Sequence, residues 1–592
     1  AISVGGTSGP AAAQPGRFVV EADAAPAGAF EHDPLATEAM RSDARLADVC
    51  FVDAKFGWAV GDRGTIWHTA DGGRSWQLQS SGVTCPLRAV WFADRQTGFA
   101  AGGTTHPYTH TSRGVWLRTR DGGRHWHRDG RLPLPAVRKL CFFDEKNGVA
   151  VACPSAMYPS GVLSTESGGR GFRPLAGGQT GRWLTGDFLG PLDGALAGRM
   201  GATAVVRRGG VEPTEQASFG LRNLRAMRLV APAGGWLVGD SGLVLQTADG
   251  GASWQLPPGD LPTAAGQFDF RALAVRGERC WVAGSPGSRV FFTPDAGRTW
   301  HALTTGSNVP IHALAFADDE RGWAAGALGT IFATRDGGRT WQRQRCGGTR
   351  AALLGLFATP DDVPLELLVQ LCGQEGYLGV VEVLARRDVE LPERAEVHAA
   401  DRLHEAAVAT GASDTAAAWR FPIRQAGLEL DAERLVEVWN RTNDGQGLEN
   451  LSRHLVRQIR TWRPAVIVTH DASPTGDDPL GLADYIEDFS EEFDRDGFFY
   501  ENPGEENERP VRPWVEAFLD QVPGNQDGIV APAPVSPPSK GKGDDHWLIK
   551  YLVDDHDDDP NGHIAITLDG GDHGPSKPGA DDPPGRKKEK GR

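Results

Sequence analysis

The octet TADGGRSW at residues 69–76 decides the fold, because the chain repeats it four more times. The copies read TRDGGRHW at 119–126, TADGGASW at 247–254, TPDAGRTW at 293–300 and TRDGGRTW at 334–341. Each octet lies inside a longer unit, which in the first copy runs LADVCFVD, FGWAVG, GTIWHTADGG and SWQLQSSG. Four short apolar runs joined by glycine turns predict one four-stranded antiparallel sheet for each unit.

Two further copies have lost part of the pattern. Residues 165–172, TESGGRGF, keep the skeleton with Ser167 for Asp and Phe172 for Trp. Residues 194–210, GALAGRMGATAVVRRGG, align with the middle of the first unit but lack its acidic turn. With these copies the chain has seven units. Small sheets that cannot bury both faces alone must stack, so we predict an all-β seven-bladed propeller over residues 47–346.

The octet resembles the Asp-box (BNR) repeat, and the fuller pattern GWAVGDRGTIWHTADGGRSW resembles the propeller of photosystem II stability/assembly factors and their non-photosynthetic relatives. We expect each box aspartate to accept backbone N–H bonds in its turn and each box tryptophan to pack between neighbouring sheets. The positions are Asp71, Asp121, Asp249, Asp295 and Asp336, with Trp76, Trp126, Trp254, Trp300 and Trp341. Asp boxes lie on the periphery of a propeller, so their role here is structural.

A propeller glycosidase is one alternative, because Asp boxes also occur in sialidases. A sialidase needs three convergent arginines and a Tyr–Glu pair, yet the propeller repeats contain just Tyr108 and Tyr158. The stretch GDSG at 239–242 mimics a serine-protease motif, but it aligns with the turn GDRG at 61–64. The sequence therefore disfavours both kinds of active site.

After residue 350 the pattern changes to strands that alternate with helices. ALLGLFATPDD (352–362) and AVIVTHDAS (465–473) are typical of buried strands, and 398–413 and 448–464 are typical of helices. This alternation predicts an α/β Rossmann-like domain over residues 351–525. Function in such sheets gathers at the carboxyl ends of the strands, where Asp361, Asp362 and His470 stand.

ATPDDV and RPAVIVTHDASPTGDDPLG resemble the two motifs of the LmbE-like (PIG-L) zinc de-N-acetylases, A-H-P-D-D-E and R-P-x-V-x-x-T-H-D followed by G-H-P-D-H. The resemblance implies Asp361 as general base and Asp362 as a metal ligand, with Asp477 and His470 as weaker candidates for the metal site. Thr359 replaces one zinc histidine, and Asp477 or Asp478 stands where the other belongs. Catalytic zinc normally has three protein ligands rich in imidazole, so we predict a degenerate pseudo-enzyme without a cofactor. We expect a divalent cation only if this domain is active.

Charge divides the chain in two. Residues 1–350 hold 37 Lys and Arg against 30 Asp and Glu, and residues 351–592 hold 24 against 47. Nearly all the cations of the first part are arginines, the side chain suited to bidentate carboxylate recognition. No run of eighteen apolar residues predicts a membrane span, and the terminal RKKEKGR is too small a patch to imply nucleic acid.

The ends are expected to differ from the two domains. Residues 1–46 form an extension with a candidate ring-closing strand at RFVVEAD (17–23), and residues 526–592 form a Pro-, Gly- and Asp-rich tail that we expect to be largely disordered. The chain starts at Ala1 without a basic-then-apolar leader, which favours an exported protein whose signal peptide has been removed.

These observations favour a non-catalytic binding or assembly protein. Its Arg-rich propeller would recognise a protein or peptide, supported by an inactive deacetylase-like domain. The alternatives are a metal-dependent de-N-acetylase of N-acetyl sugars with a rebuilt site, and the propeller glycosidase.

Overall fold

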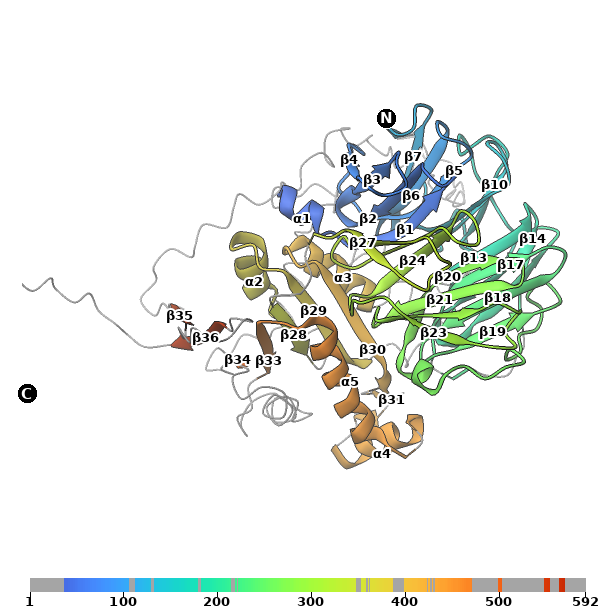
Figure 1. Ribbon diagram of the computed structural model, residues 1–592. Coiled ribbons are helices and arrows are strands. Elements are labelled where there is room, and N and C mark those ends of the chain that lie inside the picture. Colours follow the sequence, from blue (N-terminus) through green and yellow to red (C-terminus); the bar gives the residue numbers. More distant parts are fainter. Residues whose placement is uncertain are drawn as a thin grey trace, which may run out of the picture.

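The computed structural model describes residues 37–105, 112–128, 133–178, 183–214, 219–220, 222–347, 353–357, 360, 363–386, 399–422, 424–425, 428–429, 432–443, 445–470, 499–502, 548–553 and 564–569. A ring of β-sheets occupies the first part, and an α/β unit packs beside it (Figure 1). Short helix α1 (Glu38–Ser42) precedes the ring. No disulfide joins the seven cysteines, all of which lie among the described residues.

Seven antiparallel sheets build the propeller, so the predicted number of blades is confirmed. Blade 1 holds β1 (Leu46–Phe51), β2 (Gly57–Gly61), β3 (Ile66–Thr69) and β4 (Gln77–Gln79); blade 2 holds β5 (Leu87–Phe92), β6 (Gly98–Thr105), β7 (Ser112–Thr119) and β8 (His127–Arg128); blade 3 holds β9 (Val137–Phe142), β10 (Gly148–Ala152), β11 (Val162–Thr165) and β12 (Arg173–Pro174); blade 4 holds β13 (Trp183–Gly190), β14 (Asp193–Gly198), β15 (Thr203–Arg207) and β16 (Gly210–Pro213). Blade 5 holds β17 (Leu224–Val230), β18 (Gly234–Gly239) and β19 (Val244–Thr247); blade 6 holds β20 (Asp269–Arg276), β21 (Arg279–Ser285), β22 (Arg289–Thr293) and β23 (His301–Thr304); blade 7 holds β24 (Ile311–Phe316), β25 (Gly322–Gly326), β26 (Ile331–Thr334) and β27 (Gln342–Arg345).

The first strand of each blade is the innermost one. Strand β1 packs against β5 on one side and β24 on the other, and the remaining first strands follow in chain order, which closes the ring. Blades 1 and 7 each take their strands from their own repeat, so they meet through side chains. The candidate ring-closing strand at 17–23 lies outside the described residues.

Aromatic side chains join the blades at their junctions. Between blades 7 and 1, Trp323 of β25 stacks on Phe51 of β1 with ring centroids 3.5 Å apart, and its indole donates to the Gly72 carbonyl at 3.1 Å. The box tryptophan Trp76 also meets Phe51, edge to face. The same arrangement recurs between blades 1 and 2 and between blades 6 and 7, through Trp58, Phe92 and Trp126, and through Trp281, Phe316 and Trp341.

Each box aspartate organises the turn that presents this carbonyl. Asp71 accepts hydrogen bonds from Thr69 Oγ1 at 2.9 Å, from the Ser75 backbone N–H at 3.0 Å and from Ser75 Oγ at 2.7 Å. Desolvation opposes these bonds, but together they lower the pKa of Asp71 to about 2. Gly72 has a φ of 76° and Gly73 a φ of 88°, in the left-handed region that favours glycine. The remaining intact boxes have matching contacts at Asp121, Asp249, Asp295 and Asp336.

The second unit is built on a five-stranded parallel sheet with the order β30-β29-β28-β33-β34. Its strands are β28 (Leu353–Phe357), β29 (Gly379–Arg386), β30 (Asp414–Pro422), β33 (Val466–His470) and β34 (Phe499–Asn502). Its helices are α2 (Leu365–Leu368), continued by the π-turn Val369–Gln374, α3 (Ala399–Ala409), α4 (Ala432–Thr442) and α5 (Gly447–Trp462). The short hairpin of β31 (Arg424–Gln425) and β32 (Leu428–Glu429) precedes α4, and β35 (Leu548–Val553) pairs with β36 (Ile564–Asp569).

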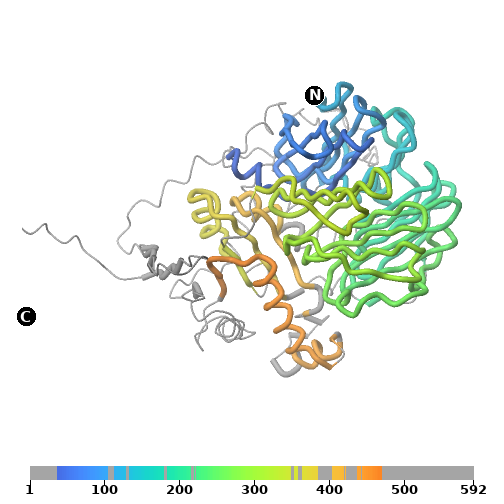
Figure 2. Tube along the Cα trace, viewed as in Figure 1, coloured from blue at the N-terminus to red at the C-terminus, as the bar shows by residue number. Residues whose placement is uncertain are grey.

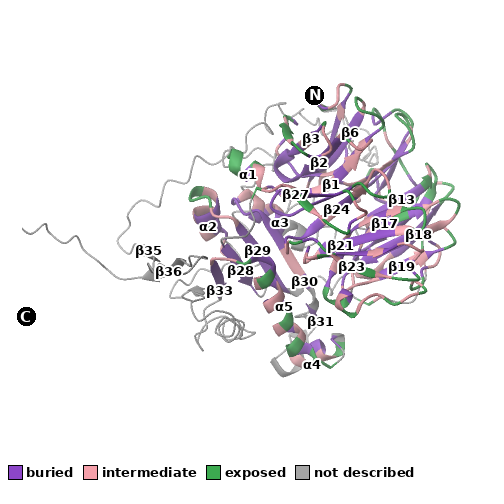
Figure 3. Cartoon of the chain, viewed as in Figure 1, coloured by how far each residue is buried: buried purple, intermediate pink, exposed green. Residues whose placement is uncertain are grey.

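Both faces of this sheet are covered, and the propeller contributes to one of them. Alternate residues of β28 enter two apolar clusters, one with α2 and α3 and the other with α4 and α5. Val309, Ala327 and Leu328 of the propeller belong to the second cluster. The tube trace shows the α/β unit alongside the ring (Figure 2), and the strands at the centre of both parts are buried (Figure 3).

Candidate functional site

A β-bulge repeats in every blade at the start of the innermost strand. In blade 1, Leu46 pairs with Gly61 and Asp48 pairs with Val60, so Ala47 is left opposite no residue. A bulge re-aims a side chain, and bulges are common next to functional sites. The seven bulged residues form what we call the bulge ring, at one end of the innermost strands: Ala47, Arg88, Arg138, Leu184, Arg225, Arg271 and His312.

The bulge ring holds arginine in four of its seven positions and histidine in a fifth, and propeller acids balance part of its charge. Arg225 donates to Asp240, whose side chain is fully buried. Arg271 lies 3.5 Å from His312, measured from guanidinium Nη1 to imidazole Nε2. Burial and the neighbouring Arg225 lower the pKa of Arg271.

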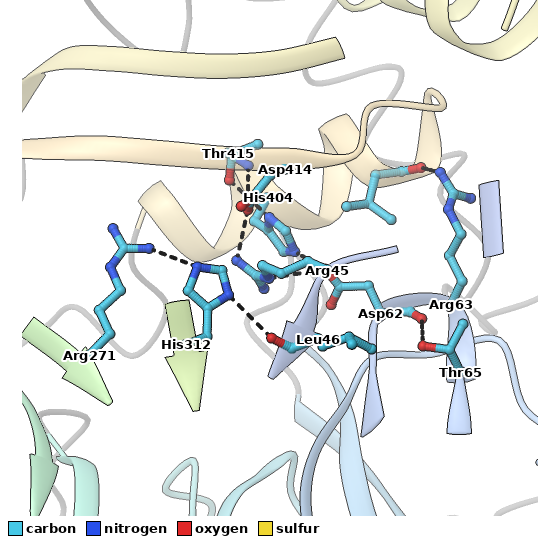
Figure 4. Close-up of polar contacts among 11 residues, drawn as sticks. Arg45, Leu46, Asp62, Arg63, Thr65, Arg271, His312, His404, Asp414 and Thr415 are labelled. Atoms are coloured by element: carbon cyan, nitrogen blue, oxygen red, sulfur yellow. Dashed lines mark hydrogen bonds and ion pairs between the residues drawn. The ribbon is translucent and has the colours of Figure 1, made fainter. Parts of the chain in front are cut away.

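The α/β unit reaches the same end of the strands with a carboxylate (Figure 4). Asp414, the first residue of β30, lies 3.2 Å from the guanidinium of Arg45, and its side chain is 3% exposed. The same guanidinium lies 3.2 Å from Asp62 in the turn between β2 and β3. Although burial alone would raise it, Arg45 and His404 hold the pKa of Asp62 well below its ordinary value.

Two buried imidazoles complete this interface. His404 of α3 lies 2.8 Å from Asp62 Oδ2 through Nε2 and 2.9 Å from Thr415 Oγ1 through Nδ1. His312 lies 3.2 Å from the Leu46 carbonyl oxygen through Nδ1, and that oxygen can accept a hydrogen bond but not donate one. Nδ1 of His312 is therefore the donor, which leaves Nε2 to accept from Arg271.

Both imidazoles favour the neutral form. Burial, followed by Arg271 and Arg45, lowers the pKa of His312 well below its ordinary value. Burial and then Arg45 lower the pKa of His404, although Asp62 acts in the opposite direction.

Further hydrogen bonds fasten the two parts together. Arg63 donates to the Val408 carbonyl at 2.6 Å, in the last turn of α3 where the helix carries partial negative charge. Arg457 of α5 donates to the Gln267 carbonyl at 2.5 Å, and Asn308 donates to the Arg460 carbonyl at 2.9 Å. These contacts fall on blades 1, 6 and 7.

The metal site expected from the sequence falls largely outside the described residues. Asp361, Asp362 and Asp477 all lie outside them. His470 is the last residue of β33, and its backbone alone is described. Within the part of the chain that the structure describes, no group of three His, Cys, Asp or Glu side chains is arranged to hold a metal ion.

Sequence reasoning missed the bulge ring and its partners. The signal that could have found the ring is the basic residue after the first apolar position, in LRAV, VRKL, LRAM and FRAL. No sequence pattern links Asp62 to His404 or Arg45 to Asp414, because these pairs are separated by 342 and 369 residues.

Comparison with known proteins supports the assignment of the propeller. The family model described as photosynthesis system II assembly factor YCF48 matches residues 29–133 and 220–313. The photosystem II assembly protein Ycf48 of Synechococcus sp. (strain JA-2-3B'a(2-13)) is 31% identical over 307 residues, which cover 48% of this chain and 84% of that protein. The chain belongs to the Ycf48 family.

Another photosystem II assembly factor and a solved structure also match this chain. The photosystem II stability/assembly factor HCF136 of Arabidopsis thaliana is 30% identical over 82 residues, which cover 13% of this chain and 20% of that protein. The chain thus spans about a fifth of that relative's length. A solved structure described as YCF48 bound to D1 peptide is 19% identical, covers 50% of this chain and 94% of that chain, and has a TM-score of 0.40. Within the described residues, no helix of this Ycf48-family chain is long and apolar enough to cross a membrane.

Proposed function

We propose that this chain is a non-catalytic binding and assembly protein whose propeller recognises acidic segments of a protein or peptide at the bulge ring. The observation that carries the proposal is the presence of arginine at four of the seven bulge positions. Membership of a family of assembly factors supports the same class of function.

Arginine suits this role physically. Its guanidinium fork pairs with a carboxylate through two parallel hydrogen bonds, and hydrogen bonds to charged groups contribute about 1.5–3 kcal/mol each. A ring of such groups at one end of the innermost strands concentrates positive potential, which speeds the approach of acidic partners.

Blades 2 to 4 are the part of the ring that we assign to an external partner. Arg88 and Arg138 stand half-buried in the bulges of blades 2 and 3, and the buried Arg199 stands in the turn of blade 4 that corresponds to Asp62. The hydrogen bonds from the α/β unit described above fall on blades 1, 6 and 7. A partner rich in Asp and Glu fits this basic arc.

Charge reversal tests the assignment. The variant Arg88→Glu/Arg138→Glu should weaken the capture of acidic peptides from a peptide array by about ten-fold or more, equivalent to about 1.4 kcal/mol. The matched control is Arg74→Glu/Arg124→Glu, because both residues are exposed in Asp-box turns and the charge change is the same. If the first variant retains every captured peptide at the affinity of the unmodified chain, the bulge ring is not the binding site.

For residues 351–525 we propose a degenerate member of the LmbE/PIG-L-like class with an α/β Rossmann-like fold, which supports the propeller and needs no cofactor. The parallel sheet with helices on both faces supports the fold part of this proposal. The missing histidine ligands at Thr359 and at Asp477 or Asp478 support the loss of catalysis. Metal analysis of the full chain should find no stoichiometric zinc. Stoichiometric zinc that is lost in Asp362→Ala would instead establish a rebuilt de-N-acetylase site.

A further inference from the structure

Leu184 is the one large apolar side chain in the bulge ring. The bulge of blade 4 leaves it opposite no residue, between Trp183, which pairs with Gly198, and Thr185, which pairs with Ala197. Leu184 is half-buried, and no apolar cluster of the described residues includes it. Because a bulge re-aims a side chain, the bulge accounts for a leucine that stays outside the core.

A second apolar side chain stands at the same end of the neighbouring blade. Met157 lies in the loop that follows β10, and the last residue of β10, Ala152, pairs with the first residue of β9, Val137. The loop therefore lies at the bulge end of blade 3. Met157 is 56% exposed, and methionine adapts its shape to different apolar partners.

The charges around Leu184 differ from those at the same place in other blades. In blades 1 and 5 the turn after the second strand holds an acid, Asp62 or Asp240, which pairs with an arginine. In blade 4 the same turn begins with Arg199 instead, and the bulge of blade 3 holds Arg138. The bulges and these turns of blades 3 and 4 contain no Asp or Glu. Leu184 is therefore flanked by positive charge that these turns do not neutralise.

We propose that Leu184 is an apolar subsite of the bulge ring, and that the ring selects acidic segments which carry a large apolar side chain among their acidic residues. The inference rests on the proposed function in one respect, namely that acidic segments bind the ring. It adds the residue that distinguishes one acidic segment from another.

Such a subsite supplies a selectivity that charge alone does not give. Arg88 and Arg138 attract carboxylates and speed their approach, but every acidic segment offers carboxylates. An apolar side chain of the ligand that contacts Leu184 removes apolar surface of both partners from water. The energy of an interface commonly concentrates in such a contact when polar groups surround it.

Two labelled peptides of equal charge test the subsite in the full chain. Each contains six glutamates, with a central leucine in one peptide and a central serine in the other. The unmodified chain should bind the leucine peptide about five-fold or more tightly than the serine peptide. Leu184→Ser should reduce this ratio of affinities to below about two-fold and leave the affinity for the serine peptide unchanged.

The matched control is Leu192→Ser in the same blade. Leu192 is 49% exposed in the turn between β13 and β14, at the opposite end of β13 from the bulge. This variant should keep the full preference for the leucine peptide. Leu184→Met retains an apolar side chain and should keep the preference as well. Leu184→Arg should lose the preference and bind the serine peptide more tightly, because it adds a cation to the ring.

The outcomes separate the subsite from the proposed function. Equal binding of the two peptides by the unmodified chain, or an undiminished ratio in a folded Leu184→Ser variant, would overturn the subsite and leave the acidic-peptide site standing. Binding of neither peptide would overturn both. If melting shows that Leu184→Ser does not fold, Leu184→Met and Leu184→Arg decide the question, and equal ratios in these two variants would contradict the role of Leu184.

Discussion

Replacing Trp323 with alanine tests whether side chains alone close the ring. Trp323 is 2% exposed, stacks on Phe51 and donates to the Gly72 carbonyl of the neighbouring blade. Truncation of a buried tryptophan costs about 3–5 kcal/mol, and the lost hydrogen bond adds about 1 kcal/mol. We therefore expect Trp323→Ala to lower the free energy of unfolding by about 4–6 kcal/mol.

Chemical denaturation measures the size of this loss, and hydrogen exchange locates it. Trp323→Phe keeps an aromatic ring over Phe51 but loses the donor, so it should cost about 1–2 kcal/mol. Trp281→Ala removes the equivalent contact between blades 6 and 7 and should cost about as much as Trp323→Ala. After Trp323→Ala, exchange should rise in both β1 and β24. A loss below about 1 kcal/mol, or one confined to blade 7, would refute closure by this aromatic contact.

Three further predictions follow from the described contacts. Asp71→Ala should lower the free energy of unfolding, measured by chemical denaturation, by about 1–3 kcal/mol. Asp71→Ser should lower it by about half as much. In blade 3 a serine, Ser167, occupies the same position and accepts a hydrogen bond from the Gly171 N–H at 3.1 Å. Asp43→Asn should raise the free energy of unfolding at pH 8 by at most about 4 kcal/mol and leave it unchanged near pH 4. The reason is that the raised pKa of Asp43 makes its ionisation unfavourable in the folded chain. Equal melting temperatures of the variant and the unmodified chain at pH 8 would contradict this. Arg63→Ala should lower the free energy of unfolding by about 1–2 kcal/mol, because the hydrogen bond to the Val408 carbonyl is lost. Arg63→Gly should lower it less, because residue 63 has a φ of 56°, which glycine adopts without strain. A larger loss of stability for glycine than for alanine would contradict this explanation.

The propeller was predictable because its determinants are local. Thr69, Asp71 and Ser75 bond to one another within a single turn, so seven residues contain the whole pattern. The copy at 194–210 was recognised without an acidic turn because the glycines and the apolar alternation of β14 and β15 remain.

The contacts between blades were harder to predict for a physical reason. The repeat pattern predicts that the box tryptophans are packing residues, but the hydrogen bond to the Gly122 carbonyl comes from Trp58 in the preceding repeat. Both tryptophans recur at fixed positions of the repeat, and the periodicity does not show which positions of adjacent repeats are in contact. A bulge is also invisible to an alternating pattern, because Arg88 follows Leu87 as any polar residue could.

The site on the α/β unit depends on position in space more than on residue type. Asp414 and His404 belong to an ordinary strand and helix, and they acquire a role because the sheet lies against blades 1, 6 and 7. Nothing in the neighbouring sequence distinguishes Asp414 from the other aspartates of this acidic part of the chain.

A single turn position explains why the α/β unit lies where it does. The residues Arg63, Met200, Ser241 and Leu328 occupy equivalent turns and share positive φ values of 56°, 51°, 58° and 50°. The repeat therefore fixes the backbone of this turn while its side chain varies freely. In blade 7 the position holds Leu328, which is fully buried in a cluster with Leu354 and Leu356, and in blade 1 it holds Arg63, which bonds to α3. In blade 5 it holds a serine, whose N–H donates to Asp269 within the propeller. Docking specificity thus comes from a position at which change does not disturb the blade, and this explains how a regular ring can acquire one covered side.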